Sequence, residues 1–428
     1  MTAKLSQTTQ RFAAKQEAIL DAAARVFNAK GLRGGTLADI AGHVGLATNS
    51  ITYYYRRHED LAVACLLRTV EALNRVIDKA QGLGTPVARV NMLFEEWLRV
   101  LGAIERSEHP ELMTFADARA LEEPSQQQVF PAYTAASNRM LELLKGPETA
   151  HLSRQALLTR NYLLVSQLSW MRLWTPGCHP EDFSTIARRG SDLMLNGLVT
   201  DESSWPSTGN EAAFWEGINA KSKFADPFLG AAATSLNRHG FHGASITRIS
   251  AYLNLTKGAF YGRGTNKDEL ITACFEKKAS VIQMAWTGLD HGSASGWERL
   301  STAMRRLIWF QLSGLGPLVR TTAILAVPGD DFQHSVREMI SRSGHQFADV
   351  VIDGMMDGSI RPCDPTLVAH SLMCTIDHAA GVSGWARSVD TNTAADMYLK
   401  PCLLGLFKGH SVPAAQTNAQ ASSSAVAT

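Results

Sequence analysis

The feature that most constrains this chain is an internal repeat. Residues 20–61 recur without a gap as residues 229–270, an offset of 209 positions. About a quarter of the paired positions are identical, and they include Leu20/Leu229, Asn28/Asn237, Gly31/Gly240, Ile40/Ile249 and Leu61/Leu270. A repeat of this length indicates a duplicated domain rather than a solenoid unit. The chain of 428 residues is therefore expected to hold two units of similar organisation.

Each copy of the repeat has the pattern of short helices joined by tight turns. In the first copy, apolar residues recur on one helical face from about residue 15 to residue 30, and Gly31 follows where a helix end favours glycine. Thr36 stands three residues before Asp39, which predicts a second helix through Val44. After the turn at 45–47, residues 48–55 form the third helix. This is the helix-turn-helix pattern of a DNA-binding unit.

The rest of the chain is also predicted to be helical, so the fold class is all-α. Apolar i, i+3, i+4 spacing predicts helices over 66–79, 87–105, 128–144, 153–174 and 183–198, and a further helical stretch over 270–407. The first dozen residues are polar and are expected to be mobile. The predicted domains are 11–65 (first helix-turn-helix head), 66–200 (first helical body), 201–227 (linker, with Phe214 and Trp215 packing down), 228–275 (second head), 276–410 (second body) and 411–428 (disordered tail).

Composition and motifs argue against membrane, secreted and catalytic proteins. The chain is 45% hydrophobic with a net charge of +1, and no apolar stretch or leader sequence stands out, which predicts a cytoplasmic protein. No P-loop, G-x-S-x-G, H-E-x-x-H or dinucleotide fingerprint is present, so we expect neither an enzyme nor a cofactor. His370, Cys374, Asp377 and His378 share one helix face, but such a face is more often packed or solvated, and no metal site is predicted.

The residues expected to contact DNA follow from the helix-turn-helix pattern, whose second short helix enters the major groove. Asparagine can pair with adenine, and lysine can reach guanine or a phosphate. Residues 11–61 hold seven Lys and Arg against five Asp and Glu, and residues 221–270 hold seven against three. The candidates for base or backbone contact are Thr36, Thr48, Asn49, Ser50, Thr52, Tyr53 and Tyr54 in the first unit, and Ser245, Lys257, Gly258, Ala259 and Tyr261 in the second.

Both units resemble the N-terminal domain of TetR-type transcriptional regulators. The matching positions are Ala23-Ala24-Arg25-Val26-Phe27, Gly31, Thr36, Ile40-Ala41, Gly45-Leu46, Ile51 and Leu61 in the first unit, and Ala232, Leu236, Gly240, Ser245, Ile249, Leu255, Gly258, Phe260-Tyr261, Lys267 and Leu270 in the second. The resemblance implies phosphate contacts from Tyr261 and Lys267. The first unit departs from the family with Thr52 at the tyrosine position and His58 at the lysine position. The second departs from it with Arg263-Gly264 in place of His-Phe.

In that family a helical ligand-binding and dimerising body follows each head, so two such bodies are expected here. Both are rich in aromatic residues and methionine, which suits a pocket for a small apolar or aromatic effector. The candidate pocket residues are Trp97, Phe115, Arg119, Tyr162 and Trp170 in the first body, and Trp309, His345, Met373 and Asp377 in the second.

The sequence therefore predicts a tandem TetR-like regulator that binds a double-stranded DNA operator as a ligand-responsive repressor. Two heads in one chain permit an internal pseudo-dimer on an imperfect palindrome, with residues 183–198 packing against 366–380. A homodimer with four heads remains an alternative. So do an activator, a ligand-independent regulator with only one functional DNA-binding head, and a protein–protein adaptor.

Overall fold

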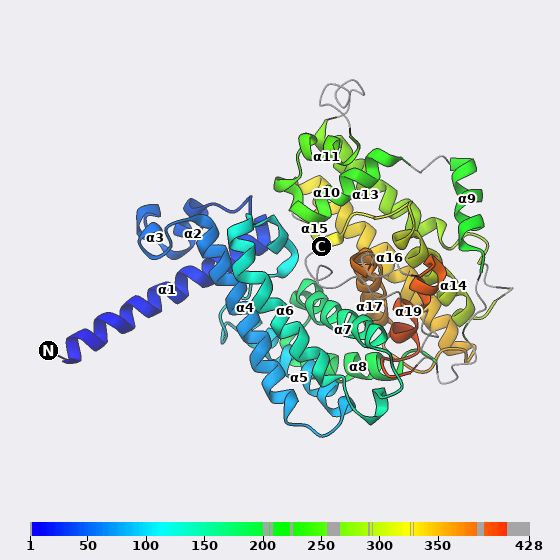
Figure 1. The fold of residues 1–428 in the computed structure, drawn as a ribbon, viewed down its shortest axis with the longest axis horizontal. Helices are drawn as coiled ribbons and strands as arrows, with labels where there is room; N and C mark the ends of the chain where they lie inside the picture. The colour runs from blue at the N-terminus through cyan, green and yellow to red at the C-terminus, as the bar shows by residue number, and fades with distance from the viewer. Residues whose placement is uncertain are drawn as a thin grey trace, which may run out of the picture.

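A computed structural model of the chain describes residues 2–199, 205, 209–222, 226–254, 266–289, 292, 294–325, 327, 329–382 and 389–408. All regular secondary structure within these ranges is helical, which confirms the predicted all-α fold (Figure 1). No helix in this part of the chain is both long enough and apolar enough to cross a bilayer.

The helices follow the duplicated order that the sequence predicts. The first unit contains α1 (Thr2–Lys30), α2 (Leu37–Val44), α3 (Thr48–Tyr54), α4 (His58–Gln81), α5 (Pro86–Glu105), the 3-10 helix η1 (Phe115–Ala120), α6 (Glu123–Leu143), α7 (Arg154–Trp174) and α8 (Phe183–Asn196). After α9 (Glu211–Ser222), the second unit contains α10 (Pro227–Gly243), α11 (Ile246–Tyr252), α13 (Lys267–Met284), α14 (Gly296–Leu312), α15 (Thr321–Leu325), α16 (Asp330–Met356), α17 (Pro365–His378), η6 (Ala379–Val382) and α19 (Thr391–Leu403).

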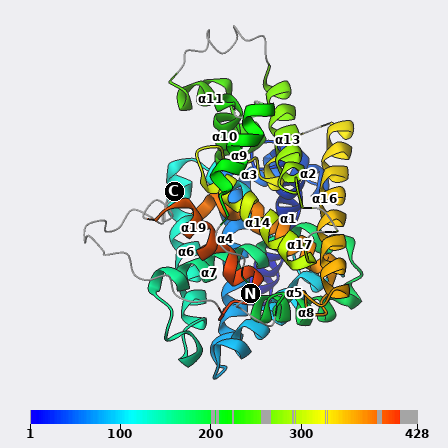
Figure 2. The ribbon, with the colours of Figure 1, turned by 90° about the vertical axis from the view of Figure 1, so that its right-hand side faces the viewer.

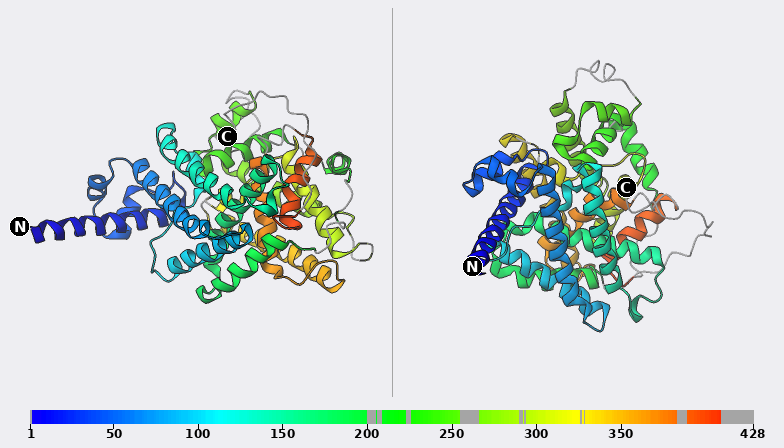
Figure 3. Two further views of the ribbon diagram at one scale, coloured as in Figure 1. Left: turned by 60° about the horizontal axis from the view of Figure 1, so that its bottom comes forward. Right: turned by 60° about the vertical axis from the view of Figure 1, so that its left-hand side comes forward.

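The predicted start of the first helix near residue 15 is wrong, because α1 begins at Thr2. Residues 2–14 contain neither glycine nor proline, so nothing in the local sequence ends the helix. Phe12 also anchors this part of α1, with its ring 4.7 Å from that of Tyr54. The helix projects beyond the rest of the first unit in the left view of Figure 3.

The segment between the units carries a packed helix. Within the predicted linker 201–227, α9 lies against α14, and the fully buried Trp215 donates its indole N–H to the Arg306 carbonyl at 3.0 Å. The Arg306 guanidinium lies 3.7 Å from the ring centre of Phe214. Both aromatic residues pack down as their apolar character predicts. The tail at 411–428 lies outside the described residues.

The buried apolar side chains fall into two clusters. One belongs to the first head and includes Ile19, Phe27, Ile40 and Ile51, together with residues from the segment that follows α5. The other runs through both bodies and continues into the second head, where it includes Leu236 and Ile249. The first head therefore has a core of its own, whereas the second head shares the core of the bodies.

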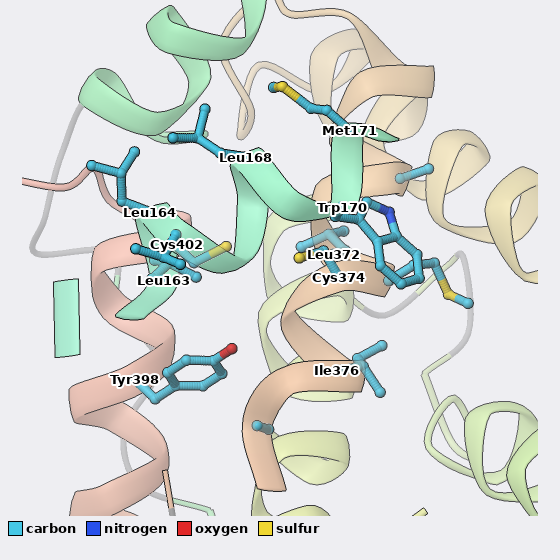
Figure 4. Packing of buried hydrophobic residues seen from close by; sticks show 14 of the residues in the cluster. Leu163, Leu164, Leu168, Trp170, Met171, Leu372, Cys374, Ile376, Tyr398 and Cys402 are labelled. Atoms are coloured by element: carbon cyan, nitrogen blue, oxygen red, sulfur yellow. The ribbon is translucent and has the colours of Figure 1, made fainter. Parts of the chain in front are cut away.

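The two bodies meet along a seam formed by α7 and α8 of the first unit and by α17 and α19 of the second (Figures 1 and 2). The expected contact between residues 183–198 and 366–380 is present, since α8 touches α17, but α7 makes more of the seam than α8 does. In Figure 4, Leu163 and Trp170 of α7 lie on the side of α17 and α19, whereas Leu164 and Leu168 point away from these helices. The other labelled residues are Met171, Leu372, Cys374, Ile376, Tyr398 and Cys402.

Polar groups cross the seam as well. Arg160 donates from Nε to the Leu406 carbonyl at 2.6 Å, and Gln167 donates from Nε2 to the Ser371 carbonyl at 3.0 Å. The Tyr162 hydroxyl donates to the His378 carbonyl at 2.9 Å. Burial lowers the pKa of the His378 imidazole to about 4, so this side chain is neutral at physiological pH. These three side chains of α7 are thus buried with hydrogen-bond partners across the seam.

The ends of α8 and α19 are joined by nearly reciprocal backbone hydrogen bonds. The Leu198 N–H donates to the Leu403 carbonyl, and the Leu406 N–H donates to the Met194 carbonyl, each at 2.7 Å. Gly197 and Gly405 follow the two helices and both have positive φ, 67° and 117°. A Cβ on Gly197 would lie 2.3 Å from the Leu404 carbonyl carbon, so only glycine fits this crossing.

We expect Gly197→Ala to destabilise the chain strongly, by at least about 2 kcal/mol more than Gly358→Ala. Gly358 is a matched control because its φ is 78° and a Cβ there would meet nothing within 4 Å. The free energy of unfolding from urea titrations measures the difference. An equal loss of unfolding free energy in the two variants would show that the backbone crossing of α8 and α19 tolerates a Cβ at position 197.

Candidate nucleic-acid interface and ligand pocket

An asparagine in each head clamps a segment that connects two helices of its body. Asn28 of α1 donates from Nδ2 to the Leu112 carbonyl at 2.9 Å and accepts the Thr114 N–H on Oδ1 at 2.9 Å. At the repeat-equivalent position, Asn237 of α10 makes the same pair of bonds to Leu318 and Arg320, at 2.9 and 2.7 Å. The amide side chain satisfies one carbonyl and one N–H of an extended segment in each case. Each head is thereby fixed to its own body in the same way.

Further repeat-equivalent contacts confirm that the two heads share one local geometry. The Cys65 thiol donates to the Leu20 carbonyl, and the Cys274 thiol donates to the Leu229 carbonyl, both at 3.6 Å. The hydroxyls of Thr36 and Ser245 cap α2 and α11 by accepting the N–H three residues on. Thr36 is exposed, although Asp39 accepts a hydrogen bond from its hydroxyl at 2.8 Å. Both capping side chains thus stabilise a helix start in the free protein.

Helix α3 carries the predicted base-reading residues of the first head on one exposed face. Thr48, Asn49 and Thr52 are exposed and Ser50 is half-buried, whereas Ile51 is fully buried against α1 and α4. The other two candidates on α3 are Tyr53, which is 77% exposed, and Tyr54, which is half-buried under Phe12. The outward face of α3 is therefore free to meet another macromolecule.

His58 and Lys267 occupy equivalent positions at the starts of α4 and α13, and both reach back into the preceding loop. The His58 Nε2 lies 2.7 Å from the Gly35 carbonyl, and its ring packs edge-on against Phe27. The Lys267 ammonium donates to the Phe241 carbonyl at 2.6 Å and lies 4.3 Å from the centre of the Phe241 ring. Burial lowers the pKa of Lys267. In the free chain these two side chains support the loop between the first two helices of each head.

The remaining candidates of the second head lie outside the described residues. They are Lys257, Gly258, Ala259, Tyr261 and Arg263. Their role stays a prediction from the sequence.

A pocket opens inside the first body, with an empty volume of about 550 Å³ that includes its open mouth. Its wall is mainly apolar and aromatic, with the side chains of Thr69, Ser169 and Arg172 as polar groups among them; the lining residues are Thr69, Leu73, Trp97, Leu112, Met113, Thr114, Phe115, Tyr133, Met140, Val165, Leu168, Ser169 and Arg172. Trp97 is held in place by its indole N–H, which donates to the Leu168 carbonyl at 2.8 Å. Phe115 stacks on Tyr133 with ring centres 4.5 Å apart. A site of this kind suits a small apolar ligand.

Of the nine predicted pocket residues, only Trp97 and Phe115 line this pocket. Tyr162, Trp170 and Met373 are instead part of the seam or the buried core, where large apolar side chains are needed for packing. Asp377 is buried in an ion pair with Lys278 at 2.5 Å. Arg119 lies in η1, and Trp309 and His345 lie in α14 and α16, away from the pocket wall.

The helix face that carries His370, Cys374, Asp377 and His378 is occupied by packing and hydrogen bonds. His370 stacks on Trp174 with ring centres 4.3 Å apart, and the Nδ1 of His378 lies 2.9 Å from the Cys374 carbonyl. Within the described ranges, no group of three or more His, Cys, Asp and Glu side chains could hold a metal ion.

Sequence reasoning missed two residues that connect the pocket to the first head. Arg172 is in the pocket wall, and its guanidinium forms an ion pair with Glu111, which is only 5% exposed. Glu111 in turn contacts Arg25 and Asn28 of α1. The only signal in the sequence was an acidic residue beside Pro110 in a break between helices, which is too common a pattern to identify such a junction.

Comparison with known proteins agrees with the geometry of the two heads. Residues 19–65 and 228–274 each match the family model of bacterial regulatory proteins, tetR family. Two similar solved structures are those of apo AibR, at 19% identity, and of AibR in complex with isovaleryl coenzyme A and operator DNA, at 18% identity. They cover 41% and 43% of this chain and 96% and 99% of their own chains, each with a TM-score of 0.33. No curated protein matches the sequence.

The asparagine clamps predict local effects that are separate in the two heads. Asn28→Ala should raise hydrogen exchange at the Thr114 amide and cost about 1–3 kcal/mol of stability, because a buried N–H and a buried carbonyl lose their partner. Asn237→Ala should do the same at the Arg320 amide. Each variant is the control for the other. Unchanged exchange at the Thr114 and Arg320 amides would show that the two asparagines do not stabilise these segments.

Proposed function

This chain carries two tandem TetR-type DNA-binding units, and from that premise we propose that both heads of one chain read a single operator. The observation that carries the proposal is the seam within the chain, where α7 and α8 of one unit pack against α17 and α19 of the other. Closed two-fold interfaces use one surface patch on each partner. Here the two patches belong to the same chain and cover each other, which supports an internal pseudo-dimer.

The character of the seam supports a permanent pairing. Leu163 and Leu372 are buried in it. At the ends of α8 and α19, backbone groups bond to each other, whereas in an exposed helix they would bond to water. A large hydrophobic interface of this kind resembles a domain core cut in half. Joining the units in one chain also raises their effective concentration, so tight binding to an operator needs no association of separate chains.

The operator of such a chain is an imperfect palindrome. The exposed face of α3 presents Thr48 and Asn49. The second unit has Lys257 and Gly258 at the equivalent positions of the repeat. Two different side-chain sets select different base edges. The two half-sites should therefore be related but unequal in sequence.

We further propose that the regulator is a repressor and that a small apolar or aromatic effector releases it from DNA. The pocket of the first body, with Trp97, Phe115 and Tyr133 in its wall, supports this assignment. An effector shifts a conformational equilibrium only when it binds one state better than the other. Leu112, Met113 and Thr114 line the pocket, and Asn28 of the first head bonds to two of them. A movement of the first head would therefore change the shape of the pocket.

Binding stoichiometry tests the proposal. The free chain should have the mass of a monomer, 46.5 kDa, in light scattering, and a gel shift with DNA from upstream of its own gene should give a complex of one chain per operator. Two chains on one two-half-site operator would replace the internal pseudo-dimer with a homodimer that has four heads. Protection of one half-site alone would indicate a single functional head. If the chain binds no DNA sequence selectively, the proposal of a transcriptional regulator is wrong and the protein–protein adaptor is favoured.

We expect Asn49→Ala to relax base preference at one half-site and to cost about 1–3 kcal/mol there, because an asparagine–adenine contact is lost. Lys257→Ala should weaken the other half-site. Asn138→Ala is the matched control, since Asn138 is an exposed asparagine on α6 in the first body. Fluorescence anisotropy with single-base operator variants measures the preference, and wild-type preference in Asn49→Ala would remove that residue from the base-reading surface.

A further inference from the structure

The N-terminal part of α1 carries positive charges and no negative ones. Residues 2–16 contain Lys4, Arg11 and Lys15 but neither Asp nor Glu. Arg11 and Lys15 are exposed, and neither side chain has an ion pair or a hydrogen bond within the part of the chain that the structure describes. Several other cations of the first head lie 4.0 Å or less from a carboxylate: Arg25, Lys30, Arg33 and Arg57.

Arg11 and Lys15 form a basic stripe along one side of α1. They are four residues apart, so they project within roughly 40° of each other and are about 6 Å apart along the helix axis. Glu17 projects about 160° around the helix from Lys15. On that opposite side, Glu17 pairs with Arg68 of α4 at 3.4 Å. The basic stripe therefore faces away from α4, the helix that continues into the first body.

Two contacts hold this part of α1 against the third helix of the head and the residue that follows it. The centre of the Phe12 ring lies 4.7 Å from that of Tyr54 and 6.3 Å from that of Tyr53. Gln16 donates from Nε2 to the Tyr55 hydroxyl at 3.1 Å. Because Tyr53 belongs to the exposed face of α3, the basic stripe lies beside the surface that carries the predicted base-reading residues.

The N-terminal end of α1 points away from the second head. In Figure 1, the end marked N lies on the far side of the first head from α10 and α11, and the left view of Figure 3 agrees. DNA that meets both heads would therefore reach the basic stripe only beyond the first half-site, on the side away from the second.

We propose that Arg11 and Lys15 bind backbone phosphates of the operator outside the first half-site, so that the contact with DNA extends further at this end than at the other. Adjacent cations without carboxylate partners suit a duplex, which carries one negative charge per ~1.7 Å of its axis. The proposal rests on the regulatory function given above and adds to it a contact surface that does not depend on base sequence.

The second head lacks an equivalent of the basic stripe. The equivalent positions of the repeat hold Ala220 and Phe224. The helix before the second head, α9, ends at Ser222 and packs on α14, and α10 begins separately at Pro227. The phosphate contacts at the two ends of the operator are therefore unequal.

The salt dependence of DNA binding tests the number of phosphate contacts. Fluorescence anisotropy is measured with the upstream DNA of the gel shift and with a scrambled duplex of equal length. Each phosphate contact adds about 0.9 to the steepness of log K against log salt concentration. Arg11→Gln/Lys15→Gln should therefore flatten the slope by about two units on both duplexes, and should weaken binding about tenfold or more at ~0.1 M salt.

Two further variants make this result specific. Arg154→Gln/Arg188→Gln removes the same charge from two exposed arginines of the first body that have no ion pair among the described residues, and it should leave the slope unchanged. Arg11→Lys/Lys15→Arg keeps both charges and should keep the slope. A wild-type slope in Arg11→Gln/Lys15→Gln, or an equal drop in the Arg154/Arg188 control, would overturn the proposal.

Hydroxyl-radical footprinting on the upstream DNA locates the contact. The wild-type chain should protect additional backbone beyond one half-site, the one whose base preference depends on Asn49. Arg11→Gln/Lys15→Gln should lose this flanking protection and keep both half-sites. Flanks of equal length in the wild-type footprint, or a longer flank beyond the half-site that depends on Lys257, would contradict the basic stripe.

The failure of this proposal and the failure of the proposed function give different results. An unchanged slope on upstream DNA that the chain binds selectively would refute the basic stripe alone. Equal binding of the upstream and scrambled duplexes would refute the regulator, and the slope difference would still decide whether the stripe contacts phosphates. A chain that binds neither duplex would refute both.

Discussion

The apolar contact between α7 and α8 of the first unit and α17 and α19 of the second holds the whole arrangement together. Burying one leucine-sized side chain contributes roughly 1.5–3 kcal/mol, and Leu163, Leu372 and Ile376 are all buried in this region. Separating the bodies would expose these side chains at once and would break the backbone bonds between the ends of α8 and α19. The spacing of the two heads is therefore set by one chain, and a second copy of the chain would find this surface already covered.

The duplication has left some contacts alike and changed others, and the difference follows their physical roles. The asparagine clamps satisfy backbone groups of a body segment, the caps at Thr36 and Ser245 satisfy the start of a head helix, and both units have these contacts. The groups that surround the clamped segments are not tied to the backbone in this way. One unit has Glu111 beside an open pocket, and the other has Pro317 and a buried ion pair between Lys278 and Asp377. Similar heads thus stand on bodies of different chemistry.

The two hydrophobic clusters give this asymmetry a consequence for motion. The first head has its own core, and it is joined to its body by the continuous helix α4, by the segment 111–121 and by a few polar contacts. The second head shares the core of the bodies, and its buried Leu236 and Ile249 belong to that cluster. Under the proposed function, motion of the first head would disturb the smaller cluster, whereas motion of the second head would disturb the cluster that runs through both bodies.

The sequence alone determined the fold class, the two heads and the main helices of the first body, because periodic apolar spacing, caps and glycine stops act over a few residues. It also named Thr48, Asn49 and Thr52 of α3 as contact residues, and all three are exposed. It misjudged the first dozen residues, where Phe12 meets Tyr54 only after the chain has folded. Only the tertiary structure decided the pocket. Trp170, Met373 and Asp377 have the composition of a binding site but fill the seam and an ion pair, and Glu111 meets Arg172 across 61 residues of sequence. Contacts of that range depend on how helices pack, and no local pattern records them.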